Sequence, residues 1–369
     1  MRYSIKATLL ASLLVFVNMA AAHEIRPAIA DLYLDPGELR LEIRLNLEAV
    51  IAEIEPGLAD TADSANAERY DALRKMEPDQ LLSAFDRTKF ASEIAARLGG
   101  APLSLEVVDA TAAPIGDIDL LRDSSVTLRA DLPSDGTLTL GWAPALGPLV
   151  LRLMNEGSDY SVFLEPGMTS DELPVTGAVS QSFGAVFLNY IAVGFDHIVP
   201  KGLDHVLFVV GLFLLSTRLS PLLWQISAFT AAHTITLALG LFNVVQVSPA
   251  IVEPLIALSI AYVAIENVFF SGLTRWRPAL IFAFGLLHGL GFAGVLKEFG
   301  LSRGNEVAGL IGFNIGVELG QITVVIGCFL LVGLWFGRKP WYRAAITIPA
   351  SLAVAAIGLY WFVERAILA

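Results

Sequence analysis

Long apolar segments dominate the second half of this chain and restrict its fold more than any other feature. A helix that crosses a bilayer needs about 20 mostly apolar residues. Six segments have this character, at about residues 202–217, 223–241, 252–270, 278–296, 307–336 and 342–362. They predict an all-α membrane bundle of about six transmembrane helices over residues 200–369.

Charged residues gather in the first half of the chain. From His23 to Pro174 there are 28 acidic and 12 basic side chains, a balance of −16, whereas from Val175 onward 8 acidic and 10 basic side chains nearly cancel. The first segment therefore has the composition of a soluble acidic domain. The net charge of −12 argues against a nucleic-acid partner, because phosphate binding needs a basic surface. The single cysteine excludes an intrachain disulfide and a CxxC metal site.

The N-terminus has the pattern of a secretory signal peptide over residues 1–22. Arg2 and Lys6 precede an apolar run, Ala7 to Met19, and three alanines follow it. Such a run is short for a membrane span, so cleavage is favoured over an uncleaved anchor. The acidic domain is then exported. The natural location is a bacterial inner membrane, with this domain in the periplasm.

The exported domain, residues 23–168, is predicted to be β-rich and sandwich-like with a helical insertion. Two alternating strands, Ala30 to Leu34 and Leu39 to Leu47, flank a turn and form a hairpin. The insertion is predicted as one helix at Ser64–Lys75 and a second from Pro78 to Leu98. Five further strands are expected at 103–108, 125–130, 137–142, 149–154 and 160–164. Residues 169–182 are interpreted as a linker.

Basic residues in the predicted loops orient the bundle. Arg275 and Arg277 fall in one loop, and Arg338, Lys339 and Arg343 fall in another on the same side. Because cytoplasmic loops are enriched in Lys and Arg, six spans place these loops inside and the C-terminus in the periplasm. The apolar segment 183–199 would invert this order as a seventh span. We therefore predict that it is an interfacial or re-entrant helix.

Ionisable side chains within or beside the spans are the candidate site. A charge at the bilayer centre costs roughly 2.5–3.5 kcal/mol on insertion scales, so such groups usually have a partner or line a pathway. The candidate metal ligands are Asp196, His197, Asp204, His205, His233, Glu266, His288 and Glu318. Helical rise spreads them in depth, which predicts a ladder of ligands from the outer to the inner surface.

Imidazole and carboxylate groups suit first-row divalent ions such as nickel, zinc or cobalt, either as substrate or as a bound ion. The same groups also suit a proton relay, or hydrogen bonds that lock the helices together. Polar residues such as Ser259, Asn314 and Gln321 fit this last, structural role. Glycines crowd the helix of His288 and recur every four residues near Glu318, so we expect these two helices to pack closely.

Several motifs occur together in a fixed order. They are Gly194-Phe195-Asp196-His197-Ile198, Gly202-Leu203-Asp204-His205-Val206-Leu207-Phe208, Phe229-x-x-x-His233-Thr234, Phe284-Gly285-Leu286-Leu287-His288-Gly289, and Phe313-Asn314-Ile315-Gly316-Val317-Glu318-Leu319-Gly320-Gln321. This combination resembles the HupE/UreJ family of bacterial membrane proteins, in its branch with a large exported N-terminal domain. The resemblance implies a transporter for a divalent metal, since members are regarded as nickel permeases. One feature departs from the nickel-permease pattern: His197 is followed by Ile198 rather than proline.

Three functions remain open from the sequence. The leading one is a permease for a divalent transition metal, which makes the chain a transporter rather than an enzyme. The second is an intramembrane zinc hydrolase, because three imidazoles and a carboxylate also suit catalytic zinc. The third is an assembly factor or scaffold whose exported domain binds a periplasmic or membrane protein. In each case the lipid bilayer is a partner, and in the first two a divalent metal ion is as well.

Overall fold

The computed structural model describes residues 27–368, except 57, 59, 60, 62, 63, 117–120, 134 and 300–304. The predicted signal peptide and His23 lie outside the described residues. The chain divides into two compact units, a β-rich one that ends at Ser182 and a helical one that begins at Phe183. This arrangement confirms the predicted two-part fold class.

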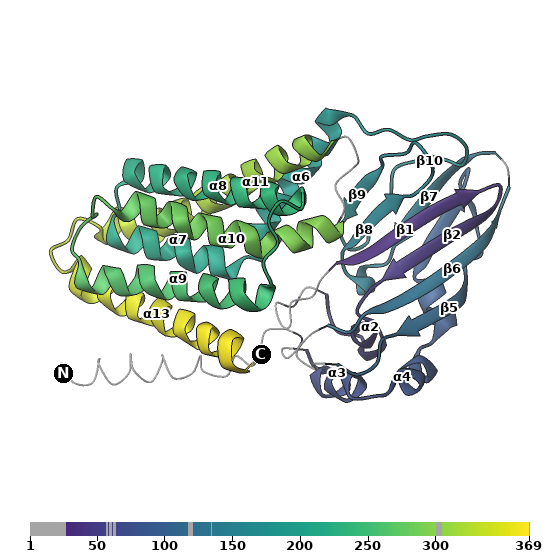
Figure 1. Cartoon of the computed structure of the whole chain (residues 1–369), viewed down its shortest axis with the longest axis horizontal. Helices are drawn as coiled ribbons and strands as arrows, with labels where there is room; N and C mark the ends of the chain where they lie inside the picture. Colours follow the sequence, from purple (N-terminus) through teal and green to yellow (C-terminus); the bar gives the residue numbers. More distant parts are fainter. Residues whose placement is uncertain are drawn as a thin grey trace. The chain divides into compact units, whose positions relative to one another are not determined.

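The β-rich domain consists of two sheets, shown in Figure 1. The larger has the order β5-β6-β2-β1-β8-β9, and the smaller has the order β10-β7-β3-β4. Strand pairs are antiparallel except β1 with β8. The strands are β1 Ala28–Asp35, β2 Gly37–Arg44, β3 Ile94–Leu98, β4 Ala101–Pro102, β5 Glu106–Ala112, β6 Ser124–Leu132, β7 Thr137–Trp142, β8 Leu149–Leu153, β9 Ser161–Leu164 and β10 Leu173–Pro174.

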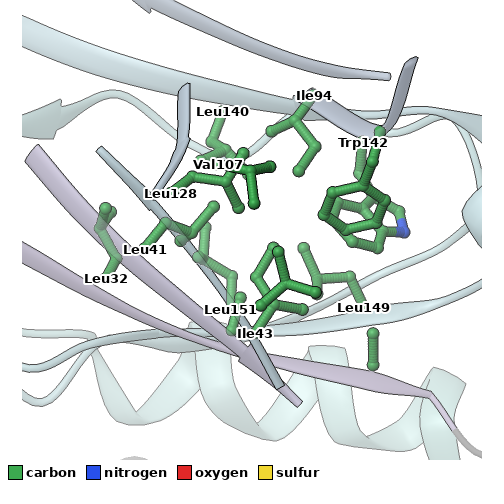
Figure 2. Packing of buried hydrophobic residues seen from close by; sticks show 14 of the residues in the cluster. Leu32, Leu41, Ile43, Ile94, Val107, Leu128, Leu140, Trp142, Leu149 and Leu151 are labelled. Carbon is green, nitrogen blue, oxygen red and sulfur yellow. The ribbon is translucent and has the colours of Figure 1, made fainter. Parts of the chain in front are cut away.

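Alternating apolar side chains from both sheets form the core of this domain. In β2, Leu39, Leu41 and Ile43 are fully buried, whereas their neighbours along the strand are more exposed. Figure 2 shows Leu41 and Leu128 of the larger sheet facing Leu140 of the smaller one. This period-two burial is what the sequence pattern predicts for strands with one face in the core.

The helical insertion differs from the prediction of one helix over Pro78–Leu98. The chain instead forms α4 (Pro78–Ala84), α5 (Arg87–Ser92) and then strand β3. Phe85 is extended and ends α4, and the Asp86 side chain accepts a hydrogen bond from the Lys89 backbone at 2.9 Å, which caps α5. From Ile94 the side chains alternate between buried and exposed as the chain pairs with β7. The remaining helices of the insertion are α2 (Leu47–Ala52) and α3 (Ala67–Arg74).

The segment interpreted as a linker, residues 169–182, belongs partly to the β-rich domain. Leu173 and Pro174 pair with β7 as strand β10, and Val175 is buried in the domain core. Apolar side chains at these positions add to the core, so this part of the segment folds with the sheets and does not act as a spacer.

The helical unit is a bundle of apolar helices that lie side by side (Figure 1). Its main helices are α6 Phe183–Ile198, α7 Leu203–Leu215, α8 Leu219–Leu241, α9 Pro249–Phe269, α10 Arg277–Phe299, α11 Glu306–Cys328 and α13 Ile348–Val363. A π-helical turn, Phe329–Gly333, joins α11 to the short α12 (Leu334–Phe336), and another, Arg343–Thr347, precedes α13.

Five segments of the described chain are long and apolar enough to cross a membrane. They overlap the last five predicted spans. Helices α6 and α7 are each short, and they meet at a bend of 71°, so the pair has the form of one broken span or of a re-entrant loop. Whether segment 183–199 is interfacial or re-entrant therefore stays a prediction.

Candidate metal centre

Four histidines from four different helices meet in one cluster. They are His197 of α6, His205 of α7, His233 of α8 and His288 of α10. His205 lies at the centre, with its ring centroid 4.9 Å from His197, 4.9 Å from His288 and 5.9 Å from His233. These residues therefore form a compact group and not the ladder that their positions in the sequence predict.

Close packing of α11 against α6 brings His197 of α6 to the cluster. Gly312, Gly316 and Gly320 of α11 face α6, and a side chain on any of them would collide with its backbone or with Ile198. A Cβ atom on Gly316 would lie 2.7 Å from the backbone nitrogen of Phe195, two residues before His197. The four-residue spacing keeps the three glycines on one helix face, so α6 and α11 approach closely.

The glycines of α10 make a different contact. A Cβ atom on Gly285 would lie 2.5 Å from the Phe229 carbonyl oxygen of α8, and one on Gly289 would collide with the His233 carbonyl oxygen. We expected the two glycine-rich helices to pack on each other through these residues. Instead each glycine face contacts another helix, and α10 contacts α11 through stacked Phe292 and Phe313 rings with centroids 4.9 Å apart.

Two overlapping sets of potential ligand atoms lie within the cluster. One set comprises His197, His205 and His233, and the other comprises Asp204, His205 and His288. Within each set, one ligand atom from every residue lies within 4.8 Å of the others. His205 belongs to both sets, so the two positions are adjacent.

One ring nitrogen of each histidine is buried without a hydrogen-bond partner in the described part of the chain. These atoms are His197 Nε2, His205 Nε2, His233 Nε2 and His288 Nδ1. A buried polar atom without a partner costs free energy, and four of them in one cluster call for a bound species that satisfies them. Imidazole nitrogens together with the Asp204 carboxylate are the donors that borderline divalent metals prefer, so the residues present fit such an ion.

Phenylalanine rings surround the cluster. The Phe292 ring centroid lies 4.1 Å from that of His197, and Phe313 lies 5.4 Å from it. Phe229 and Phe208 approach His288 at 5.0 and 5.3 Å. Because these rings hold no hydrogen-bonding groups, an ion at this place would depend on the histidines and Asp204 for its ligands, in surroundings where electrostatic interactions are strong.

The other three predicted site residues lie in separate contacts. Asp196 is partly exposed and has its carboxylate 4.0 Å from the Lys201 ammonium group. The Glu318 carboxylate accepts a hydrogen bond from the Ser227 hydroxyl at 2.6 Å, which joins α11 to α8. Neither residue belongs to the two sets of ligand atoms described above.

Glu266 forms a buried ion pair. Its carboxylate lies 2.5 Å from the guanidinium group of Arg277, which also donates to Gln225 at 3.1 Å. Only 1% of the Arg277 side chain is exposed. The sequence suggested that Arg277 was a loop cation, and nothing near it in the chain marked it as buried.

The sequence did not show that two polar residues are hydrogen-bond partners of the histidines. Asn314 contacts His233 at 3.1 Å and Ser259 contacts His288 at 3.2 Å. The sequence assigned both to helix packing. Asn314, Glu318 and Gln321 lie at spacings of four and three residues, and each contacts α8. Asn314 is the member of this stripe that contacts a histidine of the cluster, so the stripe was the sequence signal for that contact.

Most of the helical unit matches a known protein family. The family model described as HupE / UreJ protein matches residues 175–365, which is more than half of the chain. The chain belongs to the HupE/UreJ family. This is a nickel/cobalt transporter family, so transition-metal handling agrees with the donor set of the cluster. No curated protein and no solved structure matched the chain.

Proposed function

We propose that this HupE/UreJ protein is a permease for a divalent transition metal, nickel or a similar ion. Its binding site is formed by His197, Asp204, His205, His233 and His288. The observation that supports this proposal is the set of four buried imidazole nitrogens without partners, which converge beside one carboxylate. Helix packing alone leaves these atoms unexplained, because a buried polar atom without a partner costs free energy.

The ligand types favour nickel, cobalt or zinc over magnesium and calcium. Imidazole nitrogen is a good ligand for the borderline metals, whereas magnesium and calcium prefer oxygen ligands. Asp204 supplies the one carboxylate in the two sets of ligand atoms. It neutralises part of the charge of a divalent ion, which lowers the cost of holding that ion among apolar helices.

The shared ligand His205 suits transport. An ion can exchange ligands between the two adjacent positions while it stays bound to His205. A transport path needs sites that bind the ion well enough to admit it and weakly enough to release it.

The orientation of the chain is part of the proposal. The β-rich domain and the C-terminus lie in the periplasm, and the loops that carry Arg275, Arg338 and Lys339 lie in the cytoplasm, as the positive-inside rule predicts. The membrane is then the bacterial inner membrane, and the acidic domain modulates delivery of the cation without forming the path.

A paired measurement on the full chain tests this function. We expect purified protein to bind Ni²⁺, and vesicles that contain it to take up Ni²⁺, with both properties lost in His205→Gln. Glu318→Gln is the matched control for binding, because a glutamine oxygen can still accept the hydrogen bond from Ser227. It should bind Ni²⁺ as the parent does.

The outcomes separate the three functions. Tight stoichiometric zinc without uptake of any divalent metal would overturn the permease and support an intramembrane hydrolase. A protein that neither binds nor transports divalent metals would support a scaffold that binds a protein partner. Uptake that survives His205→Gln would show that the path lies elsewhere.

A further inference from the structure

We propose that Asn314 and Ser259 are positioning residues that fix the tautomers of His233 and His288. Each holds its histidine with the ring N–H directed outward, so that the other ring nitrogen faces the cluster with a free lone pair. This inference deepens the proposed function, on which its metal-binding consequence rests.

The hydrogen bonds of Asn314 determine the state of His233. The Asn314 side-chain amide donates to the Leu310 carbonyl oxygen at 2.8 Å, which identifies its nitrogen. Its oxygen, Oδ1, therefore faces His233 Nδ1 at 3.1 Å. An amide oxygen only accepts hydrogen bonds, so the hydrogen lies on His233 Nδ1. The unpartnered Nε2 is then the nitrogen with the lone pair.

The same reasoning applies to His288 with the ring nitrogens exchanged. The Ser259 hydroxyl has one hydrogen, and it donates this hydrogen to the Ile256 carbonyl oxygen at 2.7 Å. Because the contact with Ile256 is the shorter of the two, we place the hydrogen there, and the hydroxyl oxygen then accepts from His288 Nε2 at 3.2 Å. His288 therefore carries its hydrogen on Nε2. The unpartnered atom is His288 Nδ1, and it holds the lone pair.

His205 follows the pattern through Asp204. Its Nδ1 lies 3.0 Å from Asp204 Oδ1, which accepts, so in the neutral ring the unpartnered Nε2 holds the lone pair. Three of the rings thus present acceptors to the cluster. Acceptors cannot hydrogen-bond to one another, which explains why these nitrogens stay unpaired although the rings lie 4.9 to 5.9 Å apart.

This arrangement prepares the site for a cation. In the neutral, lone-pair form that a metal requires, His205, His233 and His288 do not have to change tautomer when the ion arrives. Outer partners of this kind orient metal-binding histidines, and their loss typically weakens metal affinity about 10–100-fold.

Matched variants test the inference by Ni²⁺ titration of the purified full chain. We expect Asn314→Leu to weaken Ni²⁺ binding by about 10–100-fold. Gln321→Leu is its control, because Gln321 is also buried on α11 and accepts a hydrogen bond from Thr230 of α8 without touching a histidine. Gln321→Leu should lower stability similarly and leave affinity near that of the parent.

Ser259 is tested in the same way. Ser259→Ala should weaken binding, and Ser259→Thr, which keeps the hydroxyl, should restore it. Ser351→Ala is the control, since the buried Ser351 hydroxyl bonds to Asn267 on α9 rather than to a histidine. Equal affinities in Asn314→Leu, Ser259→Ala and the two controls would overturn the positioning role.

Nitrogen NMR of metal-free protein labelled at histidine provides a readout that needs no metal. The chain has only five histidines, so each signal can be assigned with single variants. We expect His233 with its hydrogen on Nδ1 and His288 with its hydrogen on Nε2, and a loss of that preference in Asn314→Leu and Ser259→Ala. The opposite tautomers would refute the inference. If the protein shows the expected tautomers but binds no metal, the proposed function is refuted and the tautomer assignment stands.

Discussion

Replacing Gly316 with alanine tests whether the helix contact between α6 and α11 sets the geometry of the metal centre. The new Cβ atom would lie 2.7 Å from the Phe195 nitrogen and 2.9 Å from the Gly194 carbonyl carbon. Both are backbone atoms of α6, which cannot rotate away as a side chain can. The substitution therefore has to move the helix that carries His197.

The size of this movement follows from the contact distances. Ordinary van der Waals contact begins near 3.4 Å, so the Phe195 contact alone requires a shift of α6 by about 0.7 Å, and the Ile191 carbonyl oxygen, which lies still nearer the added Cβ, requires more. Metal–ligand distances tolerate only about ±0.2 Å. We expect Gly316→Ala to weaken Ni²⁺ binding by about 10–100-fold, the range typical for the loss of a contact that orients a metal ligand, and to lower stability by about 1–3 kcal/mol through overpacking.

The assay is Ni²⁺ titration of purified protein together with thermal unfolding. Gly327→Ala is the control on the same helix, because no atom lies within 4 Å of its added Cβ. It should bind Ni²⁺ like the parent, and it should not lose stability, since alanine favours helix more than glycine does. If Gly316→Ala binds Ni²⁺ within about twofold of the parent while Gly327→Ala behaves as expected, the argument from helix contact is refuted.

Four further predictions concern other parts of the chain. His205→Ala should weaken Ni²⁺ binding more than His288→Ala, because His205 belongs to both sets of ligand atoms; equal losses in titration would contradict a shared ligand. Glu266→Gln should destabilise the bundle by about 3–5 kcal/mol, since it leaves the Arg277 charge buried without its partner; an unchanged thermal midpoint would exclude this. A reporter fused after residue 369 should act as periplasmic, and cytoplasmic activity would rule out the six-span topology. A signal peptide joined directly ahead of Phe183 should leave a bundle that takes up Ni²⁺ with a higher half-saturation concentration, because the acidic domain attracts cations over a Debye length of about 8 Å; complete loss in a folded, inserted protein would place an essential site in the β-rich domain.

The architecture could be predicted from local patterns. Runs of apolar residues marked the last five helices that can cross a membrane, and alternating residues marked strands such as β1, β2 and β7. These patterns are reliable because burial depends on periodicity along a single element. The prediction of one helix over Pro78–Leu98 was wrong because local composition did not show that Ile94–Leu98 pairs with β7.

The chemistry of the site depended on contacts between elements. The sequence identified His197, His205, His233 and His288 as costly groups in apolar surroundings, but placed them at different depths. The bend between α6 and α7, together with the glycine contacts of α11 with α6, brings these rings together. Neither feature can be derived from helical rise alone, because a broken helix does not follow a straight axis.

The sequence by itself determined that this protein has a β-rich part and an apolar helical bundle, and which ionisable residues the bundle contains. Only the tertiary structure decided which of them act together. Glu266 pairs with Arg277 and Glu318 with Ser227, whereas Asp204 lies with the histidines. The physical reason is that hydrophobicity is a property of each residue and its neighbours in the chain. A ligand set depends instead on distances of a few ångströms between helices, which close packing alone determines.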